Sequence, residues 1–164
     1  MINNLKKKTK SSLGFSLVEL LVVVAILGIL SAVGITAYGG YISSTERKAT
    51  SNILQQISLA QTEEYSNSGA FYTQQTGECS PSATTSLQIE EDLLGRGGYT
   101  LETNEQSQTA KDTGYEICIG ALTGTNNYEI RAMQTNGQGG VKPVAQSCII
   151  TLNRSGISNE SDNC

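Results

Sequence analysis

The sequence of 164 residues contains no histidine and no tryptophan, and aromatic residues make up only 5% of it. The absence of histidine excludes a Cys/His zinc site and removes the commonest general base of enzymes. The chain also lacks a nucleophile elbow and a metal-binding motif, so the sequence indicates a protein that is not an enzyme and needs no cofactor or metal. With so few aromatic residues, the core must be small, of the size of one sheet against one helix.

The four cysteines include no CxxC pair. An all-cysteine metal site is one interpretation, but an even number at wide spacing favours two disulfide bonds. Disulfide bonds would place the folded part of the chain outside the cytosol. Four cysteines allow three pairings, and spacing does not choose among them. The residues are Cys79, Cys118, Cys148 and Cys164.

Charge is unevenly distributed along the chain. Four lysines and no acidic residue precede Gly14, whereas seven basic and fifteen acidic residues follow it, a net charge of −8. A generic nucleic-acid-binding domain has the opposite balance, because phosphates are bound by lysine and arginine. The lysines are Lys6, Lys7, Lys8 and Lys10.

A long run without charge follows the basic segment. No residue from Leu20 to Thr45 is charged, and Leu20 to Tyr38 is almost wholly apolar. About 20 helical residues cross a bilayer, and lysines on one side predict a cytoplasmic N-terminus. A cleaved secretory signal is disfavoured, because its apolar region is only about 7–15 residues long and no small-x-small cleavage site ends this run. A plain membrane anchor explains everything except Glu19, a carboxylate at the edge of the run.

The segment "KKKTKSSLG" followed by "FSLVELLVVVAILGILSAVGITAYGGY" resembles the N-terminus of a type IV prepilin. The shared pattern is a short basic leader ending in Gly, then Phe, a Glu four residues later and an apolar helix. Pseudopilins of type II secretion systems share this N-terminus, so the segment indicates the superfamily and not the member. Many pilins carry a proline where this chain has Thr36, and we expect a helix that is continuous in the single chain and melts locally in a filament.

The resemblance implies a role for three residues. A prepilin peptidase would cleave between Gly14 and Phe15 and then methylate the new amine of Phe15. A carboxylate in apolar surroundings needs a partner, and the sequence offers none near Glu19. The resemblance implies that Glu19 pairs with the amine of Phe15 of a neighbouring subunit and so sets the register of assembly. In the alternative interpretation, Glu19 reaches the lipid headgroups.

The rest of the chain is expected to form a pilin head. An apolar stripe at helical spacing predicts an amphipathic helix that ends near Tyr65, before "SNSGAF". The stripe consists of Ile42, Ala49, Ile53, Ile57 and Ala60. Residues 66–98 show no strand pattern, and "SLQIEEDLLG" predicts one short helical turn ending at Gly95. Its acidic cluster, Glu90, Glu91 and Asp92, is interpreted as a solvated helix start rather than as a set of calcium ligands.

Four strands are predicted after this loop, at residues 99–103, 115–122, 128–135 and 148–153, separated by turn segments such as "TGTNN" and "NGQGG". The predicted fold class is α+β, a long helix packed on a four-stranded antiparallel sheet. The tail from Cys148 to Cys164 resembles the disulfide-bounded loop of type IV pilins, which pseudopilins usually lack. That resemblance implies the bridges Cys148–Cys164 and Cys79–Cys118.

The implied organisation runs from a cleaved leader to an extracellular head. It comprises a leader (1–14), a transmembrane and filament-core helix (15–42) and a head (43–164), the head being divided into an amphipathic helix (43–65), an αβ-loop (66–98), a sheet (99–153) and a C-terminal loop (148–164). The chain would span the bacterial inner membrane once before assembly and lie in an extracellular filament afterwards. Its partners would be copies of itself, the prepilin peptidase and the inner-membrane assembly machinery.

Three functions fit this organisation. The leading hypothesis is a structural subunit of a type IV pilus used for adhesion, motility or DNA uptake. The second is a minor pilin that acts as a DNA-uptake receptor, which requires basic residues to cluster on an otherwise acidic head; the candidates are Arg96, Lys111, Arg131, Lys142 and Arg154. The third is a pseudopilin of a type II secretion system. Ser155, Ser158 and Ser161 lie in a segment expected to be exposed, where glycosylation would be sterically possible.

Overall fold

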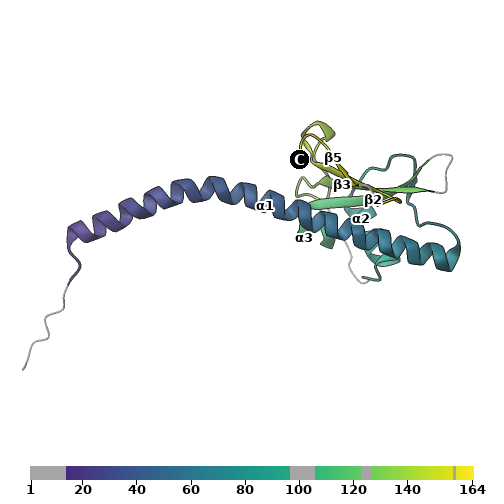
Figure 1. Ribbon diagram of the computed structural model, residues 1–164, viewed down its shortest axis with the longest axis horizontal. Helices are drawn as coiled ribbons and strands as arrows, with labels where there is room; N and C mark the ends of the chain where they lie inside the picture. The colour runs from purple at the N-terminus through teal and green to yellow at the C-terminus, as the bar shows by residue number, and fades with distance from the viewer. Residues whose placement is uncertain (1–13, 97–105, 123–126, 157) are drawn as a thin grey trace, which may run out of the picture. The chain divides into compact units, whose positions relative to one another are not determined.

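A computed structural model describes residues 14–96, 106–122, 127–156 and 158–164. The chain divides into two compact units, Met1–Tyr41 and Ile42–Cys164, which we describe separately. Figure 1 gives the order of the elements along the chain. Helix α1, Leu17–Ser68, contributes to both units. It is a single helix of 52 residues, as expected for the chain outside a filament.

In the second unit, α1 buries a narrow face. Thr50, Leu54, Ile57 and Gln61 are each at most 1% exposed, at the spacing of one helical face. The predicted stripe contained Ile57 but neither Leu54 nor the two polar residues. Gln61 is buried because its amide nitrogen donates to the carbonyl of Tyr72 (2.6 Å) and its amide oxygen accepts from the Tyr72 N–H (2.9 Å). The helix continues three residues beyond the predicted end.

The sheet has five strands in the order β1-β2-β3-β4-β5. Strands β2, β3 and β4 pair antiparallel and correspond to three of the predicted strands. The predicted four-stranded antiparallel sheet therefore needs correction: β1 pairs with β2 in parallel, and β5 adds an antiparallel edge. The predicted strand at 99–103 lies outside the described residues. The bounds are β1 Gln75–Thr76, β2 Tyr115–Ala121, β3 Tyr128–Gln134, β4 Ile149–Asn153 and β5 Ser158–Glu160.

The two added strands gave no signal in the sequence. Strand β1 has only two residues, both exposed, in a segment expected to contain no strand. All three residues of β5 are exposed as well. Neither strand has the apolar alternation that marks a half-buried strand. The α+β class is nevertheless confirmed.

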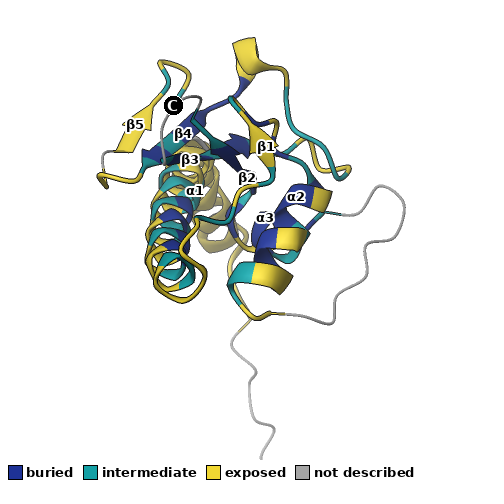
Figure 2. Cartoon of the chain, turned by 90° about the vertical axis from the view of Figure 1, so that its right-hand side faces the viewer, coloured by how far each residue is buried: buried dark blue, intermediate teal, exposed yellow. Residues whose placement is uncertain are grey.

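The core of the second unit lies between α1 and one face of the sheet, as Figure 2 shows. Alternate residues of the three central strands point to this face, because side chains alternate along a strand. They pack against Leu54 and Ile57 of α1. The strand residues in this core are Tyr115, Ile117, Ile119, Tyr128, Ile130, Ala132, Ile150 and Leu152.

Three short helical segments lie in the αβ-loop and its continuation. They are α2 (Ala83–Gln88), the π-helical η1 (Ile89–Leu93) and α3 (Gln108–Thr113). Two of them, α2 and α3, pack against β2. The predicted single helical turn is thus two consecutive segments, followed by Gly95 with φ +62°. Ser82 and Thr85 form a capping box at the start of α2. A further 3₁₀ turn, η2, spans Val144–Gln146.

Side chains complete the hydrogen bonding of β2 along its β1 side. The Ile117 N–H donates to Ser86 Oγ (2.7 Å) and its carbonyl accepts from Thr85 Oγ1 (2.8 Å). Gln74 Oε1 accepts from the Ile119 N–H (3.1 Å). These contacts continue the pairing that β1 begins at Gly120. The segment after β1 therefore stays close to β2 without forming a longer strand.

Gly120 permits this close approach. A Cβ atom at this position would lie 2.2 Å from the carbonyl oxygen of Gly77, closer than real Cβ contacts allow. The obstructing atom belongs to the backbone and cannot rotate away. The path of the αβ-loop across β2 thus requires glycine at position 120.

Candidate functional site

The predicted cleavage site precedes α1 in a segment without helix. Gly14 has open space where a Cβ atom would stand, and Phe15 is 81% exposed. Helix α1 begins at Leu17. A peptide bond outside a helix is the form that a protease can hold extended in its cleft, so this geometry is compatible with cleavage between Gly14 and Phe15.

Glu19 has a partner within its own chain, contrary to the expectation from the sequence. The Ser16 N–H donates to Glu19 Oε2 (2.9 Å), and the Glu19 N–H donates to Ser16 Oγ (3.2 Å). This is a capping box, in which an N-cap serine and a glutamate three residues later satisfy each other's backbone. The Ser-x-x-Glu spacing is its sequence signature. Glu19 thus stabilises the start of the helix in the single chain. Its negative charge also interacts favourably with the positive end of the helix dipole.

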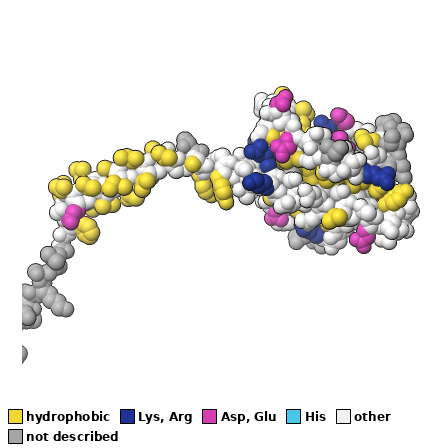
Figure 3. Space-filling view, in the orientation of Figure 1, with side chains coloured by type: hydrophobic (Ala, Val, Ile, Leu, Met, Phe, Trp, Pro, Cys, Tyr) yellow, Lys and Arg dark blue, Asp and Glu magenta, His cyan; other side chains and the backbone are white. Residues whose placement is uncertain are grey.

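The apolar side chains of α1 in the first unit are exposed. Values range from 48% for Val22 to 80% for Leu17. Figure 3 shows hydrophobic side chains spread over this segment. Within the described residues, α1 is the one helix long and apolar enough to cross a membrane, by length and composition. So much exposed apolar surface requires lipid or other protein to cover it.

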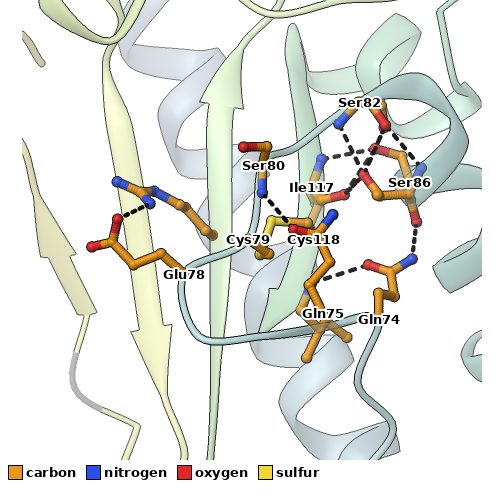
Figure 4. Close-up of a disulfide and its surroundings, with 12 residues drawn as sticks. Gln74, Gln75, Glu78, Cys79, Ser80, Ser82, Ser86, Ile117 and Cys118 are labelled. Carbon is orange, nitrogen blue, oxygen red and sulfur yellow. Dashed lines mark hydrogen bonds and ion pairs between the residues drawn. A yellow bond between two sulfur atoms is a disulfide. The ribbon is translucent and has the colours of Figure 1, made fainter. Parts of the chain in front are cut away.

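The structure joins the cysteines in the pairs that the resemblance implies. Cys79–Cys118 closes a separation of 39 residues and Cys148–Cys164 one of 16 residues. In the chain-entropy model these bridges contribute about 4 and about 3 kcal/mol to stability. The first bridge lies on the face of β2 that points away from α1 and fixes the αβ-loop there (Figure 4). The second attaches the C-terminal loop to the start of β4.

Arg47 connects the C-terminal loop to α1 within the second unit. Its Nη1 donates to the carbonyl oxygen of Cys164 (2.7 Å) and lies 3.9 Å from Glu160 Oε2. A hydrogen bond from a charged donor is stronger than a neutral one. The loop is therefore held at two points, the disulfide and Arg47. No sequence pattern pointed to Arg47, because the contact joins residues 117 positions apart.

The acidic cluster of the αβ-loop forms the solvated helix start that the sequence suggested only in part. Glu91 and Asp92 are exposed, but Glu90 is 1% exposed and accepts from the Thr109 N–H (2.6 Å). Glu116 is also buried, and its Oε2 accepts from Ser86 Oγ (2.6 Å) and Ser107 Oγ (2.7 Å). Among the described residues, no three acidic or cysteine side chains are grouped to hold a metal ion.

The basic residues of the head lie in different environments. Arg131 Nη1 is 3.2 Å from Glu78 Oε2, and Arg131 and Lys142 line the same groove. The guanidinium of Arg154 lies 4.8 Å from the ring centre of Phe71, a cation–π contact. Arg96 and Lys111 are exposed.

The three serines of the tail also differ. Ser155 and Ser158 are exposed, whereas Ser161 is half-buried. Ser161 Oγ accepts from the Ile149 N–H (3.0 Å) and so helps to hold the loop against β4. Of the three, Ser161 is the least suited to modification.

Comparison with known proteins gives concordant matches. Residues 9–35 match the family model of the prokaryotic N-terminal methylation motif, which covers Gly14, Phe15 and Glu19. The chain is 25% identical over 138 residues to the fimbrial protein EcpC of Eikenella corrodens, covering 82% of this chain and 89% of the relative. It is 29% identical over 110 residues to the type IV major pilin protein PilE of Neisseria gonorrhoeae, covering 66% of each chain. No solved structure matches.

Proposed function

We propose that this chain is a structural subunit of a type IV pilus. Its N-terminal motif resembles that of type IV pilins, and it is similar to a fimbrial protein and to a type IV major pilin. The observation that carries the proposal is the exposed apolar helix that begins directly after the cleavage motif. Such a helix is stable in a bilayer before assembly and among the same helices of neighbouring subunits afterwards. One surface thus serves both states.

Processing precedes assembly in this proposal. The prepilin peptidase cleaves between Gly14 and Phe15 on the cytoplasmic side of the inner membrane and methylates the amine of Phe15. The four lysines of the leader hold that end in the cytoplasm. The head folds on the outer side, where disulfide bonds form. The assembly machinery of the inner membrane then adds the subunit to the filament.

Glu19 changes partner during assembly. In the single chain its carboxylate accepts from the Ser16 N–H. In the filament it pairs with the positively charged amine of Phe15 of a neighbour. A charge–charge pair in apolar surroundings is stronger than a bond to a neutral amide, and a lone charge there is costly. Correct axial register is therefore favoured over other registers.

Three observations support the structural subunit over the other candidate functions. The C-terminal disulfide loop resembles that of pilins, and pseudopilins usually lack such a loop. The relatives reported above are named as a fimbrial protein and a major pilin. The net charge of −8 after Gly14 disfavours a DNA-uptake receptor. Adhesion or motility then depends on the exposed surface of the head.

The test is a Glu19→Ala substitution with Glu63→Ala as a matched control. Glu63 is an exposed carboxylate on the same helix. We expect Glu19→Ala to reduce the sheared surface filament at least tenfold, with membrane insertion and cleavage preserved, and Glu63→Ala to have little effect. An unpaired amine costs several kcal/mol at each interface.

Fractionation of cells into filament and membrane pools measures this difference. Intact-mass analysis of the filaments also tests for loss of residues 1–14 and for one added methyl group. Normal filament yield from Glu19→Ala would contradict the assembly role, and filaments that retain the leader would contradict the processing step.

A further inference from the structure

A groove of about 510 Å³ lies on the face of β3 that points away from α1. Ile130 and Ala132 of β3 belong to the core, so Arg131 and Met133 point to the opposite face, where the groove forms. One wall is the αβ-loop from Glu78 to Ser80, which carries the disulfide to β2 (Figure 4). The other is the segment 141–144. Its volume is in the range of small-ligand sites.

Arg131 has donor capacity that the protein does not use. Its side chain is 18% exposed, and its Nη1 contacts Glu78 Oε2 at 3.2 Å. Its Nε is buried, and no residue of the described chain accepts a hydrogen bond from it. A buried donor without an acceptor is unfavourable, and a guanidinium presents its donors as a fork that fits a carboxylate. Arg131 lines the groove, so an acceptor that enters the groove would lie beside this guanidinium.

The partner that Arg131 does have is weakly held. The Glu78 side chain is 80% exposed, so solvent screens its attraction to Arg131. Its carboxylate lies at the edge of the groove in the αβ-loop. An exposed carboxylate of this kind is easily displaced by another anion that contacts the same guanidinium.

Lys142 supplies a second positive charge in the same groove. Its Nζ donates to Gln134 Oε1 at 2.9 Å, and its backbone N–H donates to the carbonyl of Gln134 at 2.9 Å. The side-chain acceptor is a neutral amide and does not cancel the charge. The groove thus holds two cations against the single carboxylate of Glu78, in a head that is acidic overall.

The remaining lining of the groove is partly apolar. Met133 is buried at its base, and Val141, Pro143 and Val144 form its far wall. Val144 is 61% exposed, an apolar side chain that a ligand would cover. The arrangement suits a ligand with one negative group beside an apolar group.

We propose that this groove binds an acidic peptide segment, in which a carboxylate contacts Arg131 and Lys142 and an adjacent apolar side chain packs on Val144. Glu78 occupies the position of the carboxylate when the groove is free and swings into solvent when it is filled. A nucleic acid is disfavoured, because the net charge of −8 repels a polyanion while one short anion feels mainly the local cations. The site does not depend on the proposed filament role.

The test uses the whole chain in dodecyl maltoside micelles, with the Arg131 Nε–H resonance observed by ¹H–¹⁵N NMR. The probe is acetyl-Glu-Leu amide, and acetyl-Gln-Leu amide is its neutral control. We expect a saturable shift of this resonance with the acidic probe and none with the neutral one. Inorganic phosphate is titrated in parallel and is expected to bind more weakly than the acidic dipeptide.

Removing the competing carboxylate sharpens the test. Glu78→Gln is expected to tighten binding of the acidic probe about two- to fivefold, the value of an exposed ion pair. Glu129→Gln is the matched control, since it makes the same change of charge on the same face of β3 but does not line the groove. Lys142→Gln is expected to weaken binding, with folding checked by circular dichroism.

Several results would overturn the proposal. They are the absence of a saturable shift in the parent and in Glu78→Gln, equal effects of Glu78→Gln and Glu129→Gln, and tighter binding of phosphate than of the dipeptide. The last result would assign the groove to a phosphate-bearing ligand such as a nucleic acid.

Discussion

The two units of the chain meet the same requirement, burial of apolar surface, in opposite ways. Residues 14–41 bury none of their large apolar side chains, whereas residues 42–164 enclose a core between α1 and the sheet and add two disulfide bonds. The stability of the second unit is therefore contained within the chain. That of the first depends on a bilayer or on other subunits. A substitution should therefore affect either the folding stability of the second unit or the association of the first unit with a bilayer or other subunits.

The largest expected effect comes from the bridge that fixes the αβ-loop. Replacing Cys79 and Cys118 together by alanine removes a constraint over 39 residues and should lower the stability of the head by about 4 kcal/mol. Chemical denaturation of the whole chain in detergent, followed by tyrosine near-UV circular dichroism, measures the change. The α-helical signal of the first unit should persist, and its simultaneous loss would contradict the separation of the two units.

A matched pair of leucines in α1 tests the comparison directly. Leu54 is 1% exposed in the head core, whereas Leu27 is 56% exposed in the first unit. Leu54→Ala should destabilise the head by about 3 kcal/mol through the cavity that it leaves. Leu27→Ala should leave head stability unchanged and instead reduce filament yield. The same denaturation midpoint for both variants would show that the burial contrast does not govern stability.

The smallest expected effect is a loss of head stability at alkaline pH. Burial and the hydrogen bond to Asp92 raise the pKa of Tyr72 to about 12. The unfolded chain releases this proton near pH 10, so the contribution of Tyr72 is complete below that pH and is lost as the pH rises toward 12. After allowance for solvent screening, the contribution is about 1 kcal/mol.

Tyr72→Phe provides the measurement, because phenylalanine does not titrate. The stability difference between the parent and Tyr72→Phe should shrink between about pH 9 and pH 12 in denaturant titrations. A constant difference across this range would show that Tyr72 ionises alike in the folded and unfolded chains.

Patterns of local origin were predicted well from the sequence. The apolar run, the alternation in β2 and β3 and the α+β class all follow from periodicity, which the chain carries on its own. The capping box of Ser16 and Glu19 also has a local signature and was recoverable. The two interpretations of Glu19 drawn from the sequence, a partner in another subunit and the lipid headgroups, both lie outside its own chain.

Features that join distant segments could not be predicted in this way. Glu90 is buried because it accepts a hydrogen bond from Thr109, and Gln61 is buried because it accepts one from Tyr72. Periodicity of apolar residues does not reveal the burial of a polar residue. Strand β1 can pair with β2 because Gly120 has no Cβ atom that would clash with the backbone of the following loop. The groove at Arg131 likewise forms where three separate segments meet. Even the disulfide pairing came from a family resemblance, since spacing left three choices open.

The hydroxyl and amide side chains that complete the hydrogen bonding of β2 also affect how this strand behaves when many copies of the protein lie close together. A strand whose backbone groups are free at the edge of a sheet can pair with a strand of another molecule and begin an aggregate. In β2, Ser86, Thr85 and Gln74 already occupy those groups. Heads held side by side at very high local concentration would then have no free backbone on this side of β2 through which to fuse. Removing the hydroxyls of Thr85 and Ser86 would leave the N–H and carbonyl of Ile117 without these partners.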